Sequence, residues 1–223
     1  MSRAGVLATV VLAGCGAQPD PVCPEPLVPA YVSADEFLRI AERAPLPRLL
    51  VVNPASGPGT EAEPAFRRAI ATAQANGARV LGYVATRWGA RPRAEVARDV
   101  RRYRAWYGID GIFLDEAGDD EPRIDQYRAL AADARAAGAD FLVLNPGVVP
   151  ARAYFELADV VVTFEGSYAD YRRWHPPAWL DSERTAHLVY AAPQAADVPP
   201  NAYLTTGTLP HPWGTVTRPR ACP

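Results

Sequence analysis

Eight short apolar segments recur along the sequence, separated by stretches of helical periodicity or by loops rich in glycine and proline. They lie at 27–31, 48–53, 79–84, 108–116, 140–145, 159–164, 185–190 and 202–206. Runs this short that are apolar at nearly every position are typical of strands buried on both faces. Because strands that alternate with helices favour a parallel sheet, eight of them predict a compact (β/α)8 TIM-type barrel, an α/β fold in a single domain. An open doubly wound sheet is the alternative, although eight units exceed its usual number of strands.

The expected helices occupy the first half of the chain. A capping box at Ser33 and Glu36 predicts a first helix that ends near residue 43, and Thr60 with Glu63 is expected to cap the second. The third helix should begin near residue 92 and end at residue 108, and the fourth should run from about 122 to 138. Because the chain is short for a barrel, the later helices should be abbreviated, as the proline-rich segments 175–179 and 209–213 suggest.

Composition excludes several classes of function. The 223 residues are 49% hydrophobic and carry a formal net charge of −2, which suits one globular domain, expected to be a monomer, and does not indicate a nucleic-acid surface. No lysine occurs, so Schiff-base, P-loop and kinase chemistry that depends on lysine is excluded. The three histidines, His175, His187 and His211, are well separated, so neither a histidine-rich metal centre nor a cofactor is predicted.

The first residues have the pattern of an export signal. Arg3 precedes an apolar run from Val6 to Leu12 that is too short to span a bilayer, and the segment that ends at Cys15 resembles the lipobox of bacterial lipoproteins. We therefore expect a signal peptide at 1–14, a lipidated Cys15 with a proline-rich tether at 15–26, and the barrel at 27–223. The protein would be exported and lipid-anchored to the outer face of a bacterial membrane. An ordinary secretory signal is the alternative.

The other two cysteines flank the expected barrel. Cys23 precedes it and Cys222 follows it, and in an exported protein the two are expected to pair and to tie the ends of the domain together. Free thiols are the alternative.

Polar and aromatic residues gather where the expected strands end. In a parallel barrel the carboxyl ends of the strands converge on one mouth, where active sites lie. Two adjacent carboxylates at such an exit must desolvate beside each other, which raises the pKa of at least one. Carboxylates, amides and aromatic rings are the groups that a sugar site needs. The candidates for catalysis are Asp115, Glu116 and Glu165, and those for substrate binding are Tyr31, Asn53, Tyr83, Arg87, Asn145, Tyr190 and Trp213.

Several candidates have a purely structural alternative. Asn53 and Asn145 each precede proline, so they could simply end a strand and shape a turn. Tyr83 and Tyr190 could be packing residues of the barrel. A lone Asp at position 115 could cap a helix, but carboxylates at two strand ends favour a site.

Three motifs, in order, resemble the spherulin-4 (spherulation-specific) family. They are Val51-Val52-Asn53-Pro54-Ala55-Ser56-Gly57-Pro58-Gly59, Gly82-Tyr83-Val84-Ala85-Thr86-Arg87-Trp88-Gly89 and Asp110-Gly111-Ile112-Phe113-Leu114-Asp115-Glu116. The family is similar to (β/α)8 glycoside hydrolases that act on galactosamine-containing polysaccharides. The resemblance implies endo-type cleavage of α-1,4-linked N-acetylgalactosamine or galactosamine. It also implies an acidic pair after the fourth strand and a glutamate after the sixth, which match Asp115, Glu116 and Glu165.

These observations predict an exported glycoside hydrolase that uses two carboxylates. Asp115 is favoured as nucleophile or stabilising carboxylate and Glu165 as general acid/base, although the two roles could be reversed. Glu116 would tune their pKa values or bind substrate. The rival from another class is a non-catalytic carbohydrate-binding surface protein on a barrel scaffold. An acidic mouth containing Asp119, Asp120 and Glu121, with Arg87 paired to an acid, would favour partly deacetylated galactosamine polymers over neutral glucans.

Overall fold

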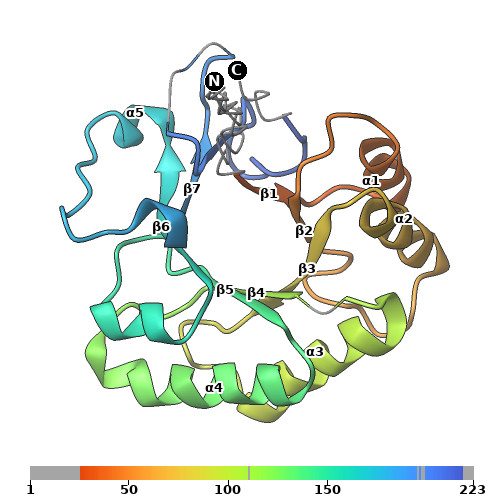
Figure 1. Cartoon of the computed structure of the whole chain (residues 1–223), viewed down its shortest axis with the longest axis horizontal. Coiled ribbons are helices and arrows are strands. Elements are labelled where there is room, and N and C mark those ends of the chain that lie inside the picture. The colour runs from red at the N-terminus through yellow and green to blue at the C-terminus, as the bar shows by residue number, and fades with distance from the viewer. Residues whose placement is uncertain (1–25, 110, 195, 197–198, 218–223) are drawn as a thin grey trace, which may run out of the picture.

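The chain folds into a ring of eight parallel strands with helices on the outside (Figure 1). The computed structural model describes residues 26–217 except 110, 195, 197 and 198. Each strand pairs in parallel with the next, from β1 to β8. The strands are β1 (Leu27–Ala30), β2 (Leu49–Val52), β3 (Arg79–Ala85), β4 (Gly111–Asp115), β5 (Phe141–Leu144), β6 (Val160–Ser167), β7 (Thr185–Tyr190) and β8 (Ala202–Leu204). The predicted barrel is confirmed.

The ring is nearly closed between its last and first strands. Within the described residues no ladder joins β8 to β1, and the backbone N–H of Tyr31 instead donates to the carbonyl of Trp213, 3.1 Å away, in the segment after β8. The final segment therefore lies against the end of β1 and brings Trp213 to the mouth of the barrel.

Long helices cover the first half of the ring and short ones the second half, as predicted. The long ones are α1 (Ala34–Ala41), α2 (Pro64–Ala75), α3 (Arg93–Tyr107) and α4 (Ile124–Ala136), preceded by the 3-10 turn η1 (Glu121–Arg123). Among their described residues, the later connections contain only η2 (Arg152–Glu156), α5 (Tyr168–Tyr171) and η3 (Ser182–Arg184). Within the described residues, no helix combines the length and apolar character that crossing a bilayer requires.

The expected helix ends are mostly correct. Ser33 caps α1, its hydroxyl accepting from the N–H of Glu36 at 3.3 Å, and α3 ends at Gly108 in the left-handed conformation. The cap predicted from Thr60 and Glu63 is wrong. α2 begins at Pro64, and its N-cap, Glu63, makes no side-chain capping hydrogen bond. Proline tolerates this position because it has no N–H to satisfy.

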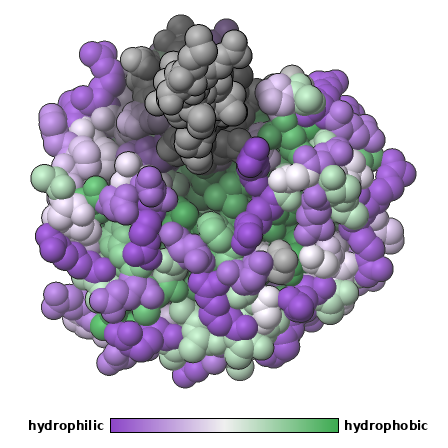
Figure 2. Space-filling view, in the orientation of Figure 1, coloured by the Kyte–Doolittle hydropathy of each residue, from purple (hydrophilic) through white to green (hydrophobic). Residues whose placement is uncertain are grey.

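Close packing of the outer helices on the strands depends on one small residue in β3. A Cβ atom on Gly82 would lie 2.5 Å from Cγ of Tyr103, so only glycine lets the buried Tyr103 ring of α3 pack directly onto the sheet. Figure 2 shows the resulting surface, with hydrophilic residues over the outer helices and hydrophobic residues in the hollow at the centre of the ring.

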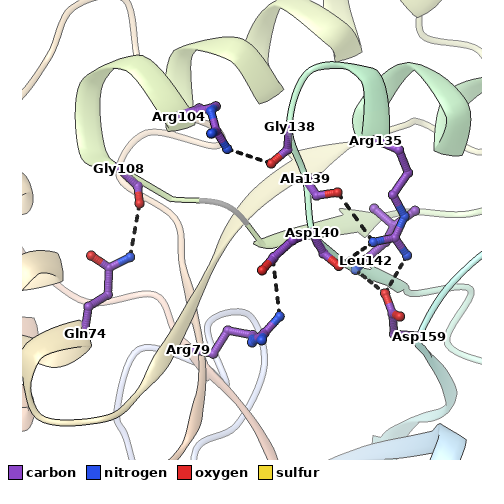
Figure 3. A network of polar contacts seen from close by, with 10 residues as sticks. All are labelled: Gln74, Arg79, Arg104, Gly108, Arg135, Gly138, Ala139, Asp140, Leu142 and Asp159. Atoms are coloured by element: carbon purple, nitrogen blue, oxygen red, sulfur yellow. Dashed lines mark hydrogen bonds and ion pairs between the residues drawn. The ribbon is translucent and has the colours of Figure 1, made fainter.

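The end of the barrel where the strands begin is fastened by polar contacts (Figure 3). Arg135 donates to Asp159 at 2.6 Å, and the same carboxylate oxygen accepts from the N–H of Leu142 at 2.7 Å. Arg79 forms a 3.3 Å ion pair with Asp140. These contacts join the starts of β3, β5 and β6. The side chains of the candidate site lie at the opposite end, the mouth, where the strands end.

Candidate active site

Two carboxylates from different strands meet at the mouth of the barrel. Asp115 ends β4 and Glu165 lies near the end of β6, and both side chains are half-buried. The side-chain nitrogen Nδ2 of Asn145, just after β5, lies 2.6 Å from Oδ1 of Asp115 and 2.6 Å from Oε2 of Glu165. The two carboxylate oxygens therefore lie no further apart than twice 2.6 Å. The structure thus brings together three of the predicted site residues.

Asn145 is fully occupied by protein contacts. Its N–H donates to the carbonyl of Leu114, its own carbonyl accepts from the N–H of Ala117, and its Oδ1 accepts from the N–H of Gly147 at 3.0 Å. Its exposed fraction is 5%. Because both Nδ2 hydrogens already point at carboxylates, Asn145 has no donor left for substrate. It positions the two acids and joins the exit of β5 to the exit of β4.

An irregularity in β6 aims Glu165 into the mouth. The register against β7 shifts between Val162 and Phe164, and β6 continues to Ser167, three residues beyond the predicted end of the strand. Such a bulge re-aims the side chains that follow it. The N–H of Glu165 donates to the carbonyl of Gly147 at 2.9 Å, which fixes its backbone beside the loop that carries Asn145.

Trp213 supports Glu165 and is not open for stacking on a sugar. Its exposed fraction is 7%, its rings contact Tyr190 and Tyr203, and its Nε1–H donates to Oε1 of Glu165 at 3.3 Å. The interpretation of Trp213 as a substrate-stacking residue is therefore corrected. Trp213 lies in a segment expected to be a loop, but it is buried because the final segment folds back against β1.

The environment of the two carboxyl groups disfavours the loss of both protons. Burial, and then the negative charge of Glu165, raise the pKa of the Asp115 carboxyl to about 7. Burial also raises the pKa of Glu165, although hydrogen bonds from Asn145 and Trp213 oppose the rise. Below pH 7 the pair accordingly keeps a proton, and Asp115, whose pKa is raised to about 7, is the group that mainly holds it.

Two of the predicted tyrosines line the same space. The hydroxyl of Tyr83 hydrogen-bonds the Asp115 carboxylate, and burial followed by the charge of Asp115 raises the pKa of Tyr83. The rings of Tyr31 and Tyr83 meet edge to face with centroids 5.5 Å apart. Burial, then Asp115 and Glu165, raise the pKa of Tyr31, so its hydroxyl also lies near the acids. The third, Tyr190, is half-buried against Trp213.

The two remaining candidates for substrate binding behave differently. Oδ1 of Asn53 accepts from the N–H of Gly57 at 2.9 Å. Asn53 therefore shapes the turn after β2, which is the structural alternative to substrate binding given above. Arg87 is exposed after β3, and within the described part of the chain it makes no ion pair. The expected pairing of Arg87 with an acid is therefore not found.

The acidic residues of the turn after β4 differ in burial and in ion pairing. Glu116 is half-buried, has a positive φ of 51°, and makes no ion pair among the described residues. Asp119 and Glu121 are exposed, whereas Asp120 forms an ion pair with Arg123. No group of three or more His, Cys, Asp or Glu side chains suited to a metal ion occurs within residues that the structure describes.

Two residues that sequence reasoning missed brace this turn. The Thr86 hydroxyl donates toward the carbonyl of Glu116 at 2.7 Å and lies 2.8 Å from the hydroxyl of Tyr127. The Tyr127 hydroxyl in turn accepts from the N–H of Gly118 at 2.7 Å. A threonine at a strand end is a weak signal in a sequence, because its partners come from elsewhere in the chain.

The predicted lipidation site Cys15 and the predicted disulfide of Cys23 with Cys222 lie outside the described residues. Both assignments remain predictions.

Comparison with known proteins gives concordant results. The family model for spherulation-specific family 4 matches residues 27–207. Spherulin-4 of Physarum polycephalum is 31% identical over 145 residues, which is 62% of this chain and 44% of that protein. The chain thus matches less than half the length of this relative. The crystal structure of Aspergillus clavatus Sph3 in complex with GalNAc superposes with a TM-score of 0.72 at 24% identity, over 86% of this chain and 92% of that one.

Proposed function

This chain belongs to spherulation-specific family 4, and on that premise we propose that it is a glycoside hydrolase acting on polysaccharides that contain N-acetylgalactosamine or galactosamine. The substrate class is supported by Sph3, a protein of similar fold that was crystallised with GalNAc. The chemistry rests on this chain's own geometry, the contact of one Asn145 nitrogen with both Asp115 and Glu165.

The spacing of the two acids favours retention of configuration. Retaining glycosidases hold their carboxyl groups about 5–5.5 Å apart, whereas inverting ones need about 6.5–9.5 Å to admit a water between them. The facing oxygens of the two acids share one donor nitrogen at 2.6 Å each, so they lie no further apart than twice that distance, which fits retention better than inversion. A double displacement follows, with one carboxylate as nucleophile and the other as acid and then base.

The raised pKa of Asp115 supports one distribution of the two roles. Asp115, with its pKa raised to about 7, donates its proton to the glycosidic oxygen while ionised Glu165 attacks the anomeric carbon and forms a glycosyl ester. The Asp115 carboxylate then takes a proton from water, the resulting hydroxide displaces Glu165 from the sugar, and both acids return to their starting states. These roles are the reverse of those favoured from the sequence, because sequence alone does not show which acid holds the proton.

Neighbouring groups support this cycle. Tyr83 stabilises the ionised form of Asp115 between the two steps, and Asn145 remains bonded to both carboxylates throughout. Trp213 donates to Oε1 of Glu165 and Asn145 donates to Oε2, so both oxygens of the attacking carboxylate are held in orientation at the mouth. Glu116 and Tyr31, which are half-buried at the ends of β4 and β1, would bind sugar hydroxyls.

The proposal includes export and a lipid anchor at Cys15. Labelling of growing cells with a fatty-acid analogue should mark the protein, and Cys15→Ala should abolish the mark. Release of an unlabelled wild type into the medium would exclude the anchor. A non-reducing peptide map should find Cys23 joined to Cys222, and separate alkylated thiols would refute the bridge.

The activity is tested by incubation with defined amino-sugar and neutral polysaccharides, with the products read by mass spectrometry. Cleavage of galactosamine-containing polymers should disappear in Asp115→Asn and Glu165→Gln and should persist in Asp125→Asn, a control on the outer face of α4 whose side chain is 92% exposed. Cleavage of neutral glucans alone would overturn the substrate class. Binding without cleavage of any polymer would favour the carbohydrate-binding alternative.

A further inference from the structure

The loop after β3 makes a left-handed turn that is unusual for its sequence. Arg87, Trp88 and Gly89 have φ values of 51°, 51° and 85°. The turn is closed by the N–H of Gly89 to the carbonyl of Thr86 at 3.1 Å and the N–H of Ala90 to the carbonyl of Arg87 at 2.9 Å. Residues with a side chain adopt this conformation at a cost, and consecutive ones are rare. Strain of this kind persists where the surroundings enforce it, and it is concentrated at ligand sites.

The exit of β4 enforces this conformation. The N–H of Thr86 donates to the carbonyl of Asp115 at 2.9 Å, and the N–H of Trp88 donates to the carbonyl of Glu116 at 2.6 Å. On the other side, the Gln126 side chain of α4 donates to the carbonyl of Gly89. The turn is therefore bonded directly to the backbone of the candidate acid Asp115, so its side chains are placed at the edge of the same mouth.

The turn displays two large side chains to solvent. Trp88 has an exposed fraction of 59%, and Arg87 is exposed, with no ion pair among residues that the structure describes. Glycine or asparagine would form the same turn with less strain. The turn thus holds an exposed indole and a guanidinium at the rim of the candidate site. Among the described residues, no contact gives either side chain a structural role.

We propose that Arg87 and Trp88 form a sugar-binding subsite, beyond the two units that flank the cleaved bond, for a neutral N-acetylated sugar. The indole face stacks on the apolar face of the ring. A guanidinium has donors and no acceptor, so Arg87 bonds the acetamide carbonyl or hydroxyl oxygens and disfavours an ammonium group, which also only donates. The nearby carboxylates Glu116 and Asp119 would attract an ammonium, and Arg87 opposes them at this subsite. This inference rests on the proposed function, and it replaces the expected preference for deacetylated polymer.

Binding, rather than turnover, gives the cleanest test. Calorimetry with N-acetylgalactosamine oligosaccharides of two to six units is done in a Glu165→Gln background, in which no cleavage occurs. Adding Trp88→Gly should weaken binding of the longer oligosaccharides roughly tenfold, while Trp88→Phe should stay within about threefold. Trp179→Ala, which removes another exposed tryptophan packed on Phe155 of η2, should leave binding unchanged. Arg87→Gln should reduce the preference for acetylated over deacetylated oligosaccharides.

Stability separates a binding role from a packing role. Because Trp88→Gly relieves strain in the turn, its melting temperature should be equal to or above that of the background protein. Weakened binding together with a clearly lower melting temperature would make Trp88 a packing residue and overturn the subsite. Equal binding by Trp88→Gly and its background would overturn the subsite alone. If the background binds no oligosaccharide of any length, the proposed function fails together with the subsite.

Discussion

Replacing Asp115 by asparagine should remove activity and, at alkaline pH, stabilise the fold. In the folded chain the pKa of Asp115 is raised from 3.8 to about 7 by burial and by the charge of Glu165. A raised carboxyl pKa contributes stability below its unfolded value that is lost as pH rises through the folded value. The free energy of unfolding of the wild type should therefore fall between about pH 4 and pH 8. The Asp115→Asn variant should not show this fall, because asparagine cannot ionise.

The magnitude follows from the size of the shift. A change from 3.8 to about 7 corresponds to roughly 4 kcal/mol at about 1.36 kcal/mol per pKa unit. Because the side chain is half-buried and partly screened by water, we expect about 2–4 kcal/mol. Asparagine has one acceptor oxygen where the carboxylate has two, which costs about 1–3 kcal/mol at every pH. The informative quantity is therefore the difference between the two pH values and not the stability at either one.

The assay is urea unfolding of wild type, Asp115→Asn and the exposed control Asp125→Asn at pH 4, 6 and 8. The free energy of unfolding of Asp115→Asn, relative to wild type, should rise by about 2–4 kcal/mol from pH 4 to pH 8, with an unchanged dependence on urea. For the control, this change between pH 4 and pH 8 should be less than about 0.5 kcal/mol. A difference for Asp115→Asn that is constant with pH would refute the raised pKa and, with it, the assignment of Asp115 as the acid.

Three further predictions concern the pH dependence of the reaction. The kcat/KM of wild type should rise with pH as Glu165 ionises, at a pKa above its ordinary 4.5, and fall above about pH 7 as Asp115 loses its proton; a flat profile across pH 5–8 would contradict these roles. Asn145→Ala removes hydrogen bonds that lower the pKa of both acids, so both limbs should move to higher pH and kcat should fall roughly 100-fold; unshifted limbs would show that Asn145 only packs. Trp213→Phe removes a bond to Glu165 alone, so only the acidic limb should move upward, and a shift of both limbs would count against the contact.

The fold could be predicted from the sequence because local signals agree with the global arrangement. The apolar run before Asp115 is a strand buried on both faces, and Ser33, Gly108 and Gly138 mark helix ends through chemistry that acts within a few residues. The converging strand ends then place Asp115, Asn145 and Glu165 at one mouth without any knowledge of contacts. The predicted start of the second helix is wrong, because α2 begins with a proline after an N-cap that makes no side-chain capping bond.

What could not be predicted depends on contacts between distant parts of the chain. Asn145 bridges two acids because β5 lies between β4 and β6, so a residue expected to bind substrate became a positioning residue. Trp213 is buried because the final segment closes the ring. The left-handed turn at Trp88 has no signal in the sequence, since neither arginine nor tryptophan favours that conformation.

The central claim is that Asp115 and Glu165 cleave a galactosamine-type glycan by double displacement. It is tested most directly by proton NMR of the first product released from a defined N-acetylgalactosamine oligosaccharide, recorded before the anomers equilibrate. The new reducing end should appear first with the configuration of the bond that was cleaved. Initial appearance of the opposite anomer would contradict it, as would an intact oligosaccharide that is bound but never hydrolysed.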